Sequence, residues 1–260
     1  MRLADKAIIV TGSTTGIGAA IAQRCLDEGA RVLLHGRDRQ RGEAMAAAAD
    51  GRAAMHVDSL EDPEAAPRIV QAAVDAFGKV DAVVNNAASS ERALLEETDA
   101  AFFDRMMAIN ARAPLLIVKA AAKHLRQSRG VVLNIGSVNA YCGEGQLLVY
   151  SMTKGALMTM SRNMADSFCH DGVRVIHFNV GWVLTPNEKQ LKIDDGYPPD
   201  WYEHIDPVFA PSGRILKPEE VAAATVYWLS DESAPISGTV LELEQYPIIG
   251  RNPTKRGDDA

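Results

Sequence analysis

The sequence is poor in cysteine and contains no long apolar run. Its three cysteines, Cys25, Cys142 and Cys169, match neither a metal site nor a disulfide framework. We therefore expect no metal centre and a reducing compartment. No apolar run reaches the roughly 18 residues that a membrane helix needs, and the chain opens directly into a strand pattern without a cleavable signal. These features predict a cytoplasmic protein without a membrane partner.

The sequence also lacks an excess of positive charge. Lysine and arginine number 27, aspartate and glutamate 34, and the net charge is −7. Because an acidic surface repels phosphate backbones, we do not expect nucleic acid as a partner. Hydrophobic residues make up 47% and charged residues 23%, an ordinary globular composition that excludes a disordered or fibrous chain.

Short apolar segments alternate with helical patterns along the chain. Because the segments are apolar throughout, they predict parallel strands with helices on both faces of the sheet. The fold class is therefore α/β, with one doubly wound parallel sheet of about seven strands in a single domain, residues 1–260. The expected strands are residues 7–11, 31–35, 53–57, 80–84, 130–135, 174–179 and 239–243.

The expected helices differ in how clearly they begin and end. Residues 62–77 predict a helix with Asp62 as its N-cap and Pro63 at the first helical position. Helical patterns continue over residues 98–125, with an interruption near Pro114, and over 150–168. Residues 187–217 are rich in proline and aromatic residues and predict irregular structure.

A glycine-rich turn follows the first expected strand and opens the next helix. Residues 11–18 read TGSTTGIG. Glycines let the backbone approach a pyrophosphate, and a helix N-terminus attracts its negative charge. A tight turn without a ligand is the alternative, but the position between strand and helix favours a dinucleotide site.

Further motifs follow this turn in a fixed order. They are the NNAA sequence of residues 85–88, Asn110, Ser137 and the YSMTK sequence of residues 150–154. The ordered set resembles the short-chain dehydrogenase/reductase family over roughly residues 3–243. The resemblance implies a Rossmann-type fold and an enzyme that transfers a hydride between a nicotinamide cofactor and an alcohol or carbonyl. By the same resemblance, the catalytic residues are expected to be Asn110, Ser137, Tyr150 and Lys154.

The resemblance also implies a set of cofactor-binding residues. Gly36 stands where NAD-preferring members carry an aspartate, and the neighbouring Arg37 can pair with a 2′-phosphate, so NADP is the preferred cofactor and NAD the alternative. The full set is Gly12, Ser13, Thr14, Thr15, Gly16, Ile17, Gly18, Arg37, Asp58, Ser59, Asn86, Ala87, Tyr150, Lys154, Gly181, Val183 and Thr185.

The catalytic pair has a chemical rationale. Tyr150 and Lys154 are four residues apart on an expected helix, so their side chains share a face. The free tyrosine pKa is about 10, and a nearby ammonium lowers the pKa of the phenol toward the range useful for proton transfer. By resemblance, Ser137 holds the substrate oxygen and Asn110 holds a water that links Lys154 to solvent. Taken alone, Tyr150 and Lys154 could equally lie on a solvent-exposed helix face without a catalytic role. The other motifs favour catalysis over this alternative.

The family resemblance does not determine the substrate. Residues 185–217 are expected to form a substrate loop whose polar groups, Glu188 among them, suit a small sugar or polyol hydroxyl. Reduction of a small ketone or a 3-oxoacyl thioester is the alternative, and a non-enzymatic dinucleotide-binding sensor is a second one. Gly136 replaces a serine of many relatives, and we expect this to be harmless.

The resemblance further implies a homotetramer, with the helix that carries Tyr150 packed against its symmetry mate. Residues 245–260 form a C-terminal tail that departs from the family pattern. Because Tyr246, Ile248 and Ile249 are too apolar for a free tail, we expect the tail to dock, either on a neighbouring subunit or on its own.

Overall fold

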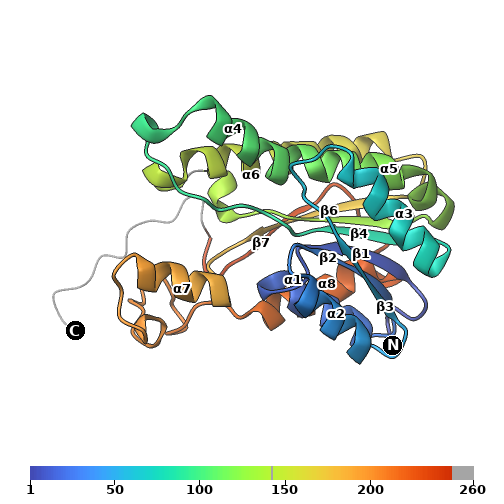
Figure 1. The fold of residues 1–260 in the computed structure, drawn as a ribbon, viewed down its shortest axis with the longest axis horizontal. Helices are drawn as coiled ribbons and strands as arrows, with labels where there is room; N and C mark the ends of the chain where they lie inside the picture. The colour runs from blue at the N-terminus through green and yellow to red at the C-terminus, as the bar shows by residue number, and fades with distance from the viewer. Residues whose placement is uncertain (142, 248–260) are drawn as a thin grey trace.

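A seven-stranded sheet forms the centre of the protein in the computed structural model, which describes residues 1–141 and 143–247. All neighbouring strands are parallel, in the order β3-β2-β1-β4-β5-β6-β7 (Figure 1). The predicted doubly wound parallel sheet is therefore confirmed. The strands are β1 (Ala7–Thr11), β2 (Arg31–Gly36), β3 (Ala53–Val57), β4 (Ala82–Asn85), β5 (Val131–Ile135), β6 (Arg174–Val180) and β7 (Val240–Leu243).

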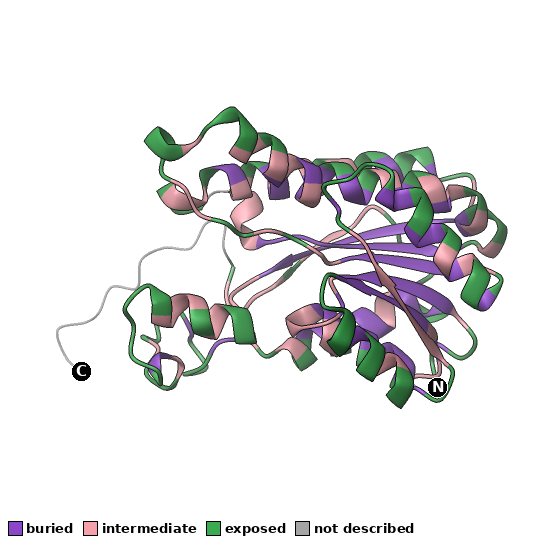
Figure 2. Ribbon diagram, in the orientation of Figure 1, coloured by how far each residue is buried: buried purple, intermediate pink, exposed green. Residues whose placement is uncertain are grey.

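Helices cover both faces of the sheet. On one face lie α1 (Gly16–Asp27), α2 (Arg39–Ala48) and α8 (Pro218–Leu229). On the other lie α3 (Ala65–Phe77), α4 (Ala100–Met107), α5 (Ala113–Ser128) and α6 (Leu148–Ser167). Two apolar clusters fill the spaces between these layers and the sheet, and Figure 2 shows the buried strands between helices whose outer faces are exposed. Among the described residues, no helix combines the length and apolarity needed to span a bilayer.

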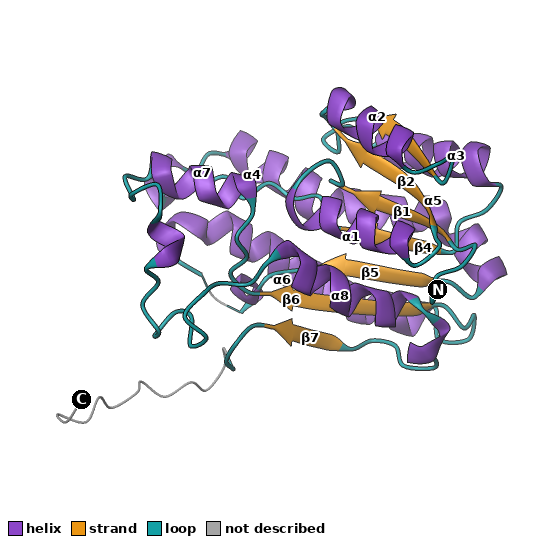
Figure 3. Cartoon of the chain, turned by 90° about the horizontal axis from the view of Figure 1, so that it is seen from below, coloured by secondary structure: helices purple, strands orange, loops and turns teal. Residues whose placement is uncertain are grey.

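The strand order reverses between β1 and β4, whose connections run to opposite edges of the sheet. In open sheets of this kind ligands bind beyond the carboxyl ends of the strands at such a reversal. Seen from below, the arrowheads of β5 and β6 point toward the end of the molecule that holds α7 (Pro186–Asp194) (Figure 3). This end is where the site is expected.

Helix α7 corrects the prediction that residues 187–217 are irregular. The Thr185 hydroxyl accepts a hydrogen bond from the Glu188 backbone N–H at 3.1 Å, and Pro186 occupies the first turn. Both are helix-starting features. A short 3₁₀ turn follows at Trp201–Glu203. Trp201, Ala210 and Ile215 are buried in a small apolar cluster of their own, with Trp182 and Tyr202 packed against it.

Two other helix boundaries differ from the prediction. Helix α3 begins at Ala65, and Asp62 is not its cap, because the Asp62 carboxylate accepts the Glu64 N–H at 2.9 Å in a turn before the helix. Between α4 and α5, residues Ala108–Arg112 form a π-helical turn just before Pro114. The interruption of the helix therefore lies a few residues before the predicted position at Pro114, and Asn110 is part of it.

Candidate active site

The glycine turn lies between the end of β1 and the start of α1. Gly12 and Gly16 have φ values of +63° and +54°, a region that favours glycine. A Cβ on Gly18 would lie 2.2 Å from the Gly12 carbonyl oxygen, so only glycine allows this close approach. No side chain caps the N-terminus of α1. Its first N–H groups are therefore available for an anion, and the turn fits a dinucleotide pyrophosphate.

The NNAA segment is hydrogen-bonded to this turn through Thr11, a residue that the sequence analysis did not select. The Thr11 hydroxyl accepts from the backbone N–H groups of Asn86 at 3.0 Å and Ala87 at 3.1 Å. The Asn86 amide in turn donates to the carbonyls of Thr11 at 2.9 Å and Gly12 at 3.2 Å. The ends of β1 and β4 are thereby joined at the point where the strand order reverses.

The end of β2 forms the expected adenosine side. The Ser13 N–H donates to the His35 carbonyl at 2.9 Å, which holds the turn against this strand. A Cβ on Gly36 would lie 2.9 Å from the Thr14 side chain. Arg37 follows on the surface and forms no salt bridge with any residue in the described part of the chain. Its guanidinium lies near Glu91, whose pKa is lowered mainly by Arg105 and to a smaller degree by Arg37.

Asp58, one of the predicted cofactor-binding residues, already has three hydrogen-bonding neighbours. Arg68 donates to its carboxylate at 2.8 and 2.9 Å, and the Ser59 N–H donates at 2.9 Å. The His56 ring lies 3.3 Å away. The Arg68 hydrogen bonds are the largest cause that lowers the pKa of Asp58 to about 2. Asp58 is therefore ionised, but its acceptor positions are engaged within the protein.

The predicted catalytic residues come together at the N-terminal end of α6. The Lys154 ammonium lies 5.6 Å from the centre of the Tyr150 ring and donates to the Ile135 carbonyl at 2.9 Å. Ser137 follows β5, is 8% exposed, accepts the Asn139 N–H at 3.2 Å and lowers the pKa of Tyr150. Two hydroxyl groups and an ammonium from separate parts of the chain are thus brought to the carboxyl edge of the sheet.

Burial changes the expected acid–base properties of this pair. The pKa of Tyr150 is raised, first by burial of the phenol and then by the negative charge of Glu188, while the hydrogen bond with Ser137 lowers it. Burial lowers the pKa of Lys154 to about 8. The predicted lowering of the Tyr150 pKa by Lys154 is therefore wrong for the protein groups alone, because desolvation of the phenol outweighs the other effects.

Asn110 is buried in the π-helical turn and is fixed on both sides. Its carboxamide oxygen accepts the Ser89 N–H at 2.8 Å, and its amide donates to the Ser89 carbonyl at 2.8 Å and to the Thr153 hydroxyl at 3.0 Å. Thr153 donates to the Tyr150 carbonyl at 2.7 Å. Asn110 is thereby linked to the first turn of α6, and its predicted role in binding water remains a prediction.

The space beside Gly136, where many relatives carry a serine, is occupied by a histidine ring. A Cβ there would lie 2.1 Å from Nε2 of His177, which is fully buried on β6. The His177 ring contacts Ser161 at 2.9 Å and Asn179 at 3.0 Å, and burial lowers its pKa to about 4. The absence of a side chain at position 136 makes room for this neutral imidazole next to Ser137.

The segment after β6 returns toward the glycine turn. A Cβ on Gly181 would lie 1.8 Å from the Glu244 carboxylate, and a Cβ on Gly16 would lie 3.2 Å from the Thr185 side chain. Val183 is buried and pairs with Leu216. Thr185 thus lies beside the glycine turn, and the nicotinamide-binding role of Gly181, Val183 and Thr185 stays a prediction.

Comparisons with known proteins agree with this arrangement. A family model described as Enoyl-(Acyl carrier protein) reductase matches residues 12–244. An L-fucose dehydrogenase of Mus musculus is 34% identical over 88% of this chain and 84% of its own length. The chain belongs to the short-chain dehydrogenase/reductase family. As a member of this family, it is an NAD(P)-dependent oxidoreductase.

Other members of the short-chain dehydrogenase/reductase family extend the range of substrates. A 2-(S)-hydroxypropyl-CoM dehydrogenase 3 of Xanthobacter autotrophicus is 32% identical over 94% of this chain and 96% of its own length. The crystal structure of a 3-ketoacyl-(acyl-carrier-protein) reductase from Brucella melitensis, complexed with NADH, has a TM-score of 0.82 and 27% identity. It covers 93% of this chain and 97% of its own. Family membership therefore establishes hydride transfer, whereas the substrates differ among relatives.

Proposed function

We propose that this enzyme oxidises a hydroxyl group of a small sugar or polyol, with NADP as its preferred cofactor. The observation that carries the proposal is the position of the Lys154 ammonium, 5.6 Å from the centre of the Tyr150 ring, together with Ser137, which lowers the pKa of the same tyrosine. The similarity to L-fucose dehydrogenases supports a sugar substrate. The presence of both Tyr150 and Lys154 argues against a sensor without catalytic activity.

In the proposed reaction the substrate alcohol loses a hydride to the cofactor and a proton to Tyr150. A bound nicotinamide supplies the acceptor for the hydride that leaves the substrate carbon. Ser137 and Tyr150 hold the substrate oxygen, and the deprotonated Tyr150 accepts its proton as the carbonyl forms. The positive charge of Lys154 would favour the phenolate and so oppose the raised pKa that burial gives Tyr150. Asn110 keeps the first turn of α6 in place through Thr153.

Residues of the glycine turn, with Asn86, Ala87, Gly181, Val183 and Thr185, would hold the cofactor. For NADP, the supporting features are the exposed Arg37 and the absence of a carboxylate at Gly36. An arginine pairs well with a phosphate, whereas an aspartate in this place would repel it. Asp58 and Ser59 would border the adenine, although Arg68 already engages the Asp58 carboxylate.

Reduction of a small ketone or a 3-oxoacyl thioester is the second candidate. The structural similarity to a 3-ketoacyl-(acyl-carrier-protein) reductase favours it. The same hydroxyls would then donate the proton to a carbonyl oxygen. A panel of aldoses, polyols, ketones and 3-oxoacyl thioesters, assayed with NADP and NAD through the absorbance of reduced nicotinamide, distinguishes the two candidates. We expect the highest kcat/KM for an aldose or polyol with NADP, and preferential reduction of a thioester would contradict the proposal.

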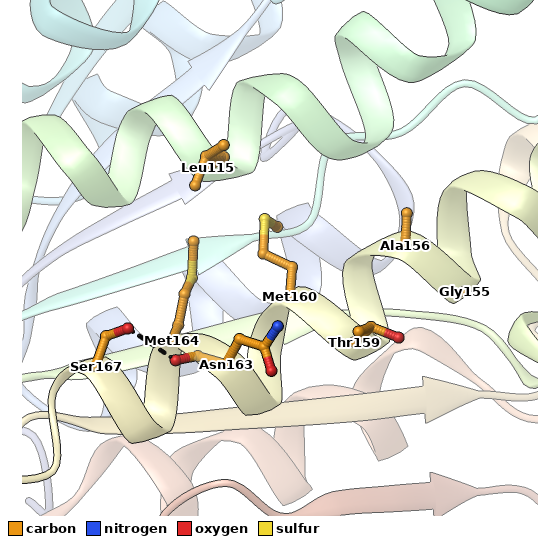
Figure 4. A pocket seen from close by; sticks show the side chains of 8 residues that line it. All are labelled: Leu115, Gly155, Ala156, Thr159, Met160, Asn163, Met164 and Ser167. Carbon is orange, nitrogen blue, oxygen red and sulfur yellow. Dashed lines mark hydrogen bonds between the residues drawn. The ribbon is translucent and has the colours of Figure 1, made fainter.

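We also propose that the enzyme forms a homotetramer, in which α5 and α6 pack against a second copy. Leu115 is 46% exposed on α5, and next to it Met160 and Met164 of α6 line a shallow apolar hollow (Figure 4). An exposed apolar surface of this kind suits a two-fold interface. Light scattering at micromolar concentration tests the proposal, since a mass near 28.0 kDa would reject it.

The cytoplasm is the compartment that we propose for the enzyme. Cys25 and Cys169 are free thiols, which suits a reducing environment. In the C-terminal tail, Gln245 donates to the Arg214 carbonyl at 2.7 Å. Ile248 and Ile249 lie outside the described residues, so the docking of the tail stays a prediction.

A further inference from the structure

The ring of His177 lies against the backbone of the reaction centre. Gly136 joins Ile135, the last residue of β5, to Ser137. The Ile135 carbonyl accepts a hydrogen bond from the Lys154 ammonium at 2.9 Å. A Cβ on Gly136 would lie 2.1 Å from Nε2 and 2.7 Å from Cε1 of the His177 ring. The imidazole therefore packs directly on the residue that connects the acceptor of Lys154 with Ser137.

The other edges of the His177 ring are held by a chain of buried hydrogen bonds. Nδ1 lies 2.9 Å from the Ser161 hydroxyl, and Nε2 lies 3.0 Å from the Asn179 carboxamide oxygen. Asn134 donates to the Ser161 hydroxyl at 2.8 Å, and Asn85 donates to the Asn134 oxygen at 2.8 Å. Each of these five residues is at most 2% exposed. The chain runs from β4 through β5 and α6 to β6, and it fixes the imidazole both from the helix and from its own strand.

These contacts select one protonation state of the His177 imidazole. The Asn179 amide donates to Sδ of Met158 at 3.4 Å, so its oxygen faces the ring, and this oxygen can only accept. The proton of the neutral ring is therefore on Nε2. Nδ1 then accepts from the Ser161 hydroxyl, which also lies 2.7 Å from the Leu157 carbonyl. Since both nitrogens are engaged within the protein, the ring is suited to hold its neighbours in place and not to exchange a proton with a substrate.

A buried ring with both nitrogens hydrogen-bonded is a rigid support, because a fully satisfied polar network favours a single arrangement. We propose that His177 is a positioning residue, which through Gly136 fixes the backbone that carries Ser137 and so sets where the Ser137 hydroxyl meets the substrate oxygen. The inference rests on the proposed role of Ser137 in the reaction. Displacement of a reacting group by about 1 Å can slow a reaction by about 100-fold, so loss of this support should be visible in turnover.

Gly136 and His177 share one space, which gives a test by exchange. His177→Ala empties the space, and kcat should fall by about ten- to 100-fold while the Kd of NADP changes little. Gly136→Ser alone should also lose turnover, because its Cβ would collide with the imidazole. In the double variant Gly136→Ser/His177→Ala, the serine enters the emptied space from the other side, and most of the turnover should return. His177→Gln keeps a hydrogen-bond donor near the position of Nε2 and should retain most of the turnover.

Val175→Ala is the matched control for a loss of stability. Val175 is fully buried on the same strand, two residues before His177, and it pairs with Val132 near the start of β5. Urea unfolding shows how far each variant is destabilised. The kcat is then measured on folded protein with NADP and L-fucose, or with the best substrate of the panel if that is another compound. Val175→Ala should keep the turnover of the wild type.

Several results would overturn the positioning role. They are an equal kcat for His177→Ala and Val175→Ala, or a double variant that folds without regaining turnover. An unchanged kcat in folded Gly136→Ser would overturn it as well, so the test does not depend on the stability of His177→Ala. A shifted pH profile of kcat in His177→Gln would make the imidazole a proton-transfer group and would contradict the proposal.

Ser137→Ala separates a failure of this inference from a failure of the proposed function. Full turnover in Ser137→Ala would remove the role on which the inference rests. A loss of turnover in Ser137→Ala beside full turnover in His177→Ala would contradict the inference alone. We expect both variants to be slow, with Ser137→Ala the slower of the two.

Discussion

The cofactor side and the substrate side of the site are built in different ways. On the cofactor side, backbone groups of the glycine turn meet the ends of β1 and β4, and the spacing leaves no room for a Cβ at Gly18. On the substrate side, side chains of a separate segment pack in a small cluster around Trp201. A site built from backbone groups suits the nicotinamide cofactor that family members have in common. A site built from side chains can be altered to take another substrate while the sheet stays the same.

The two sides are also connected differently to the rest of the fold. The glycine turn is continuous with the main core, while the end of α7 is held by an ion pair between Asp195 and Arg92 at 2.5 Å. Partly exposed pairs of this kind contribute at most about 1 kcal/mol. Substitutions on the cofactor side should therefore affect folding and all substrates together, and substitutions on the substrate side should affect selectivity.

The largest effect is expected for Gly18→Ala. A new Cβ would lie 2.2 Å from the Gly12 carbonyl oxygen and 2.4 Å from the Asn86 amide. Overpacking of this kind costs about 1–3 kcal/mol of unfolding free energy, and we expect the upper end together with a strong loss of cofactor affinity. Gly145→Ala is the control, because a Cβ there meets nothing within 4 Å. Urea unfolding and cofactor titration measure both effects, and equal stability of the two variants would contradict the tight backbone site.

A smaller and more selective effect is expected for Arg37→Ala. Loss of a pairing with the 2′-phosphate should weaken NADP binding by about 1.5–3 kcal/mol, the scale of a hydrogen bond to a charged group. Binding of NAD should barely change, because NAD lacks this phosphate. Titration of both cofactors measures the difference, and Arg39→Ala, an exposed arginine of α2, is a suitable control. Equal weakening of both cofactors, or a wild type that prefers NAD, would reject NADP preference.

The smallest effect is expected for the loss of folding stability at acidic pH. Burial lowers the pKa of His177 to about 4 from an ordinary 6.5, so below pH 6.5 the unfolded chain binds a proton that the folded chain does not. Stability should therefore fall by about 1–2 kcal/mol between pH 7 and pH 5 on account of this imidazole. His177→Gln should reduce that loss, and His204→Gln, at an exposed position, should not. Urea unfolding at both pH values measures it, and an identical acid loss in all three proteins would show that His177 is not the cause.

The sequence motifs predicted the parts of the site that depend on local order. The TGSTTGIG turn and the Tyr150–Lys154 spacing each lie within one strand–helix unit, and the structure places them together at the sheet edge. Helix α7 carried its own signal in Thr185, Pro186 and Glu188, but the surrounding prolines and aromatic residues obscured it.

Contacts between distant segments could not be predicted in this way. Gly136 and His177 are far apart in the sequence, and their contact depends on the pairing of β5 with β6. The raised pKa of Tyr150 depends on burial by several elements, which no spacing of residues reveals.

The most direct test is the turnover of Tyr150→Phe compared with the wild type, because Tyr150 is the proposed proton acceptor. The variant keeps the ring and removes the hydroxyl that carries the proton. With L-fucose or the best substrate of the panel, formation of reduced nicotinamide should slow by at least about 100-fold, the lower range for a general acid–base group. Cofactor affinity should change little. Turnover close to that of the wild type would contradict the assignment of Tyr150 and the mechanism built on it.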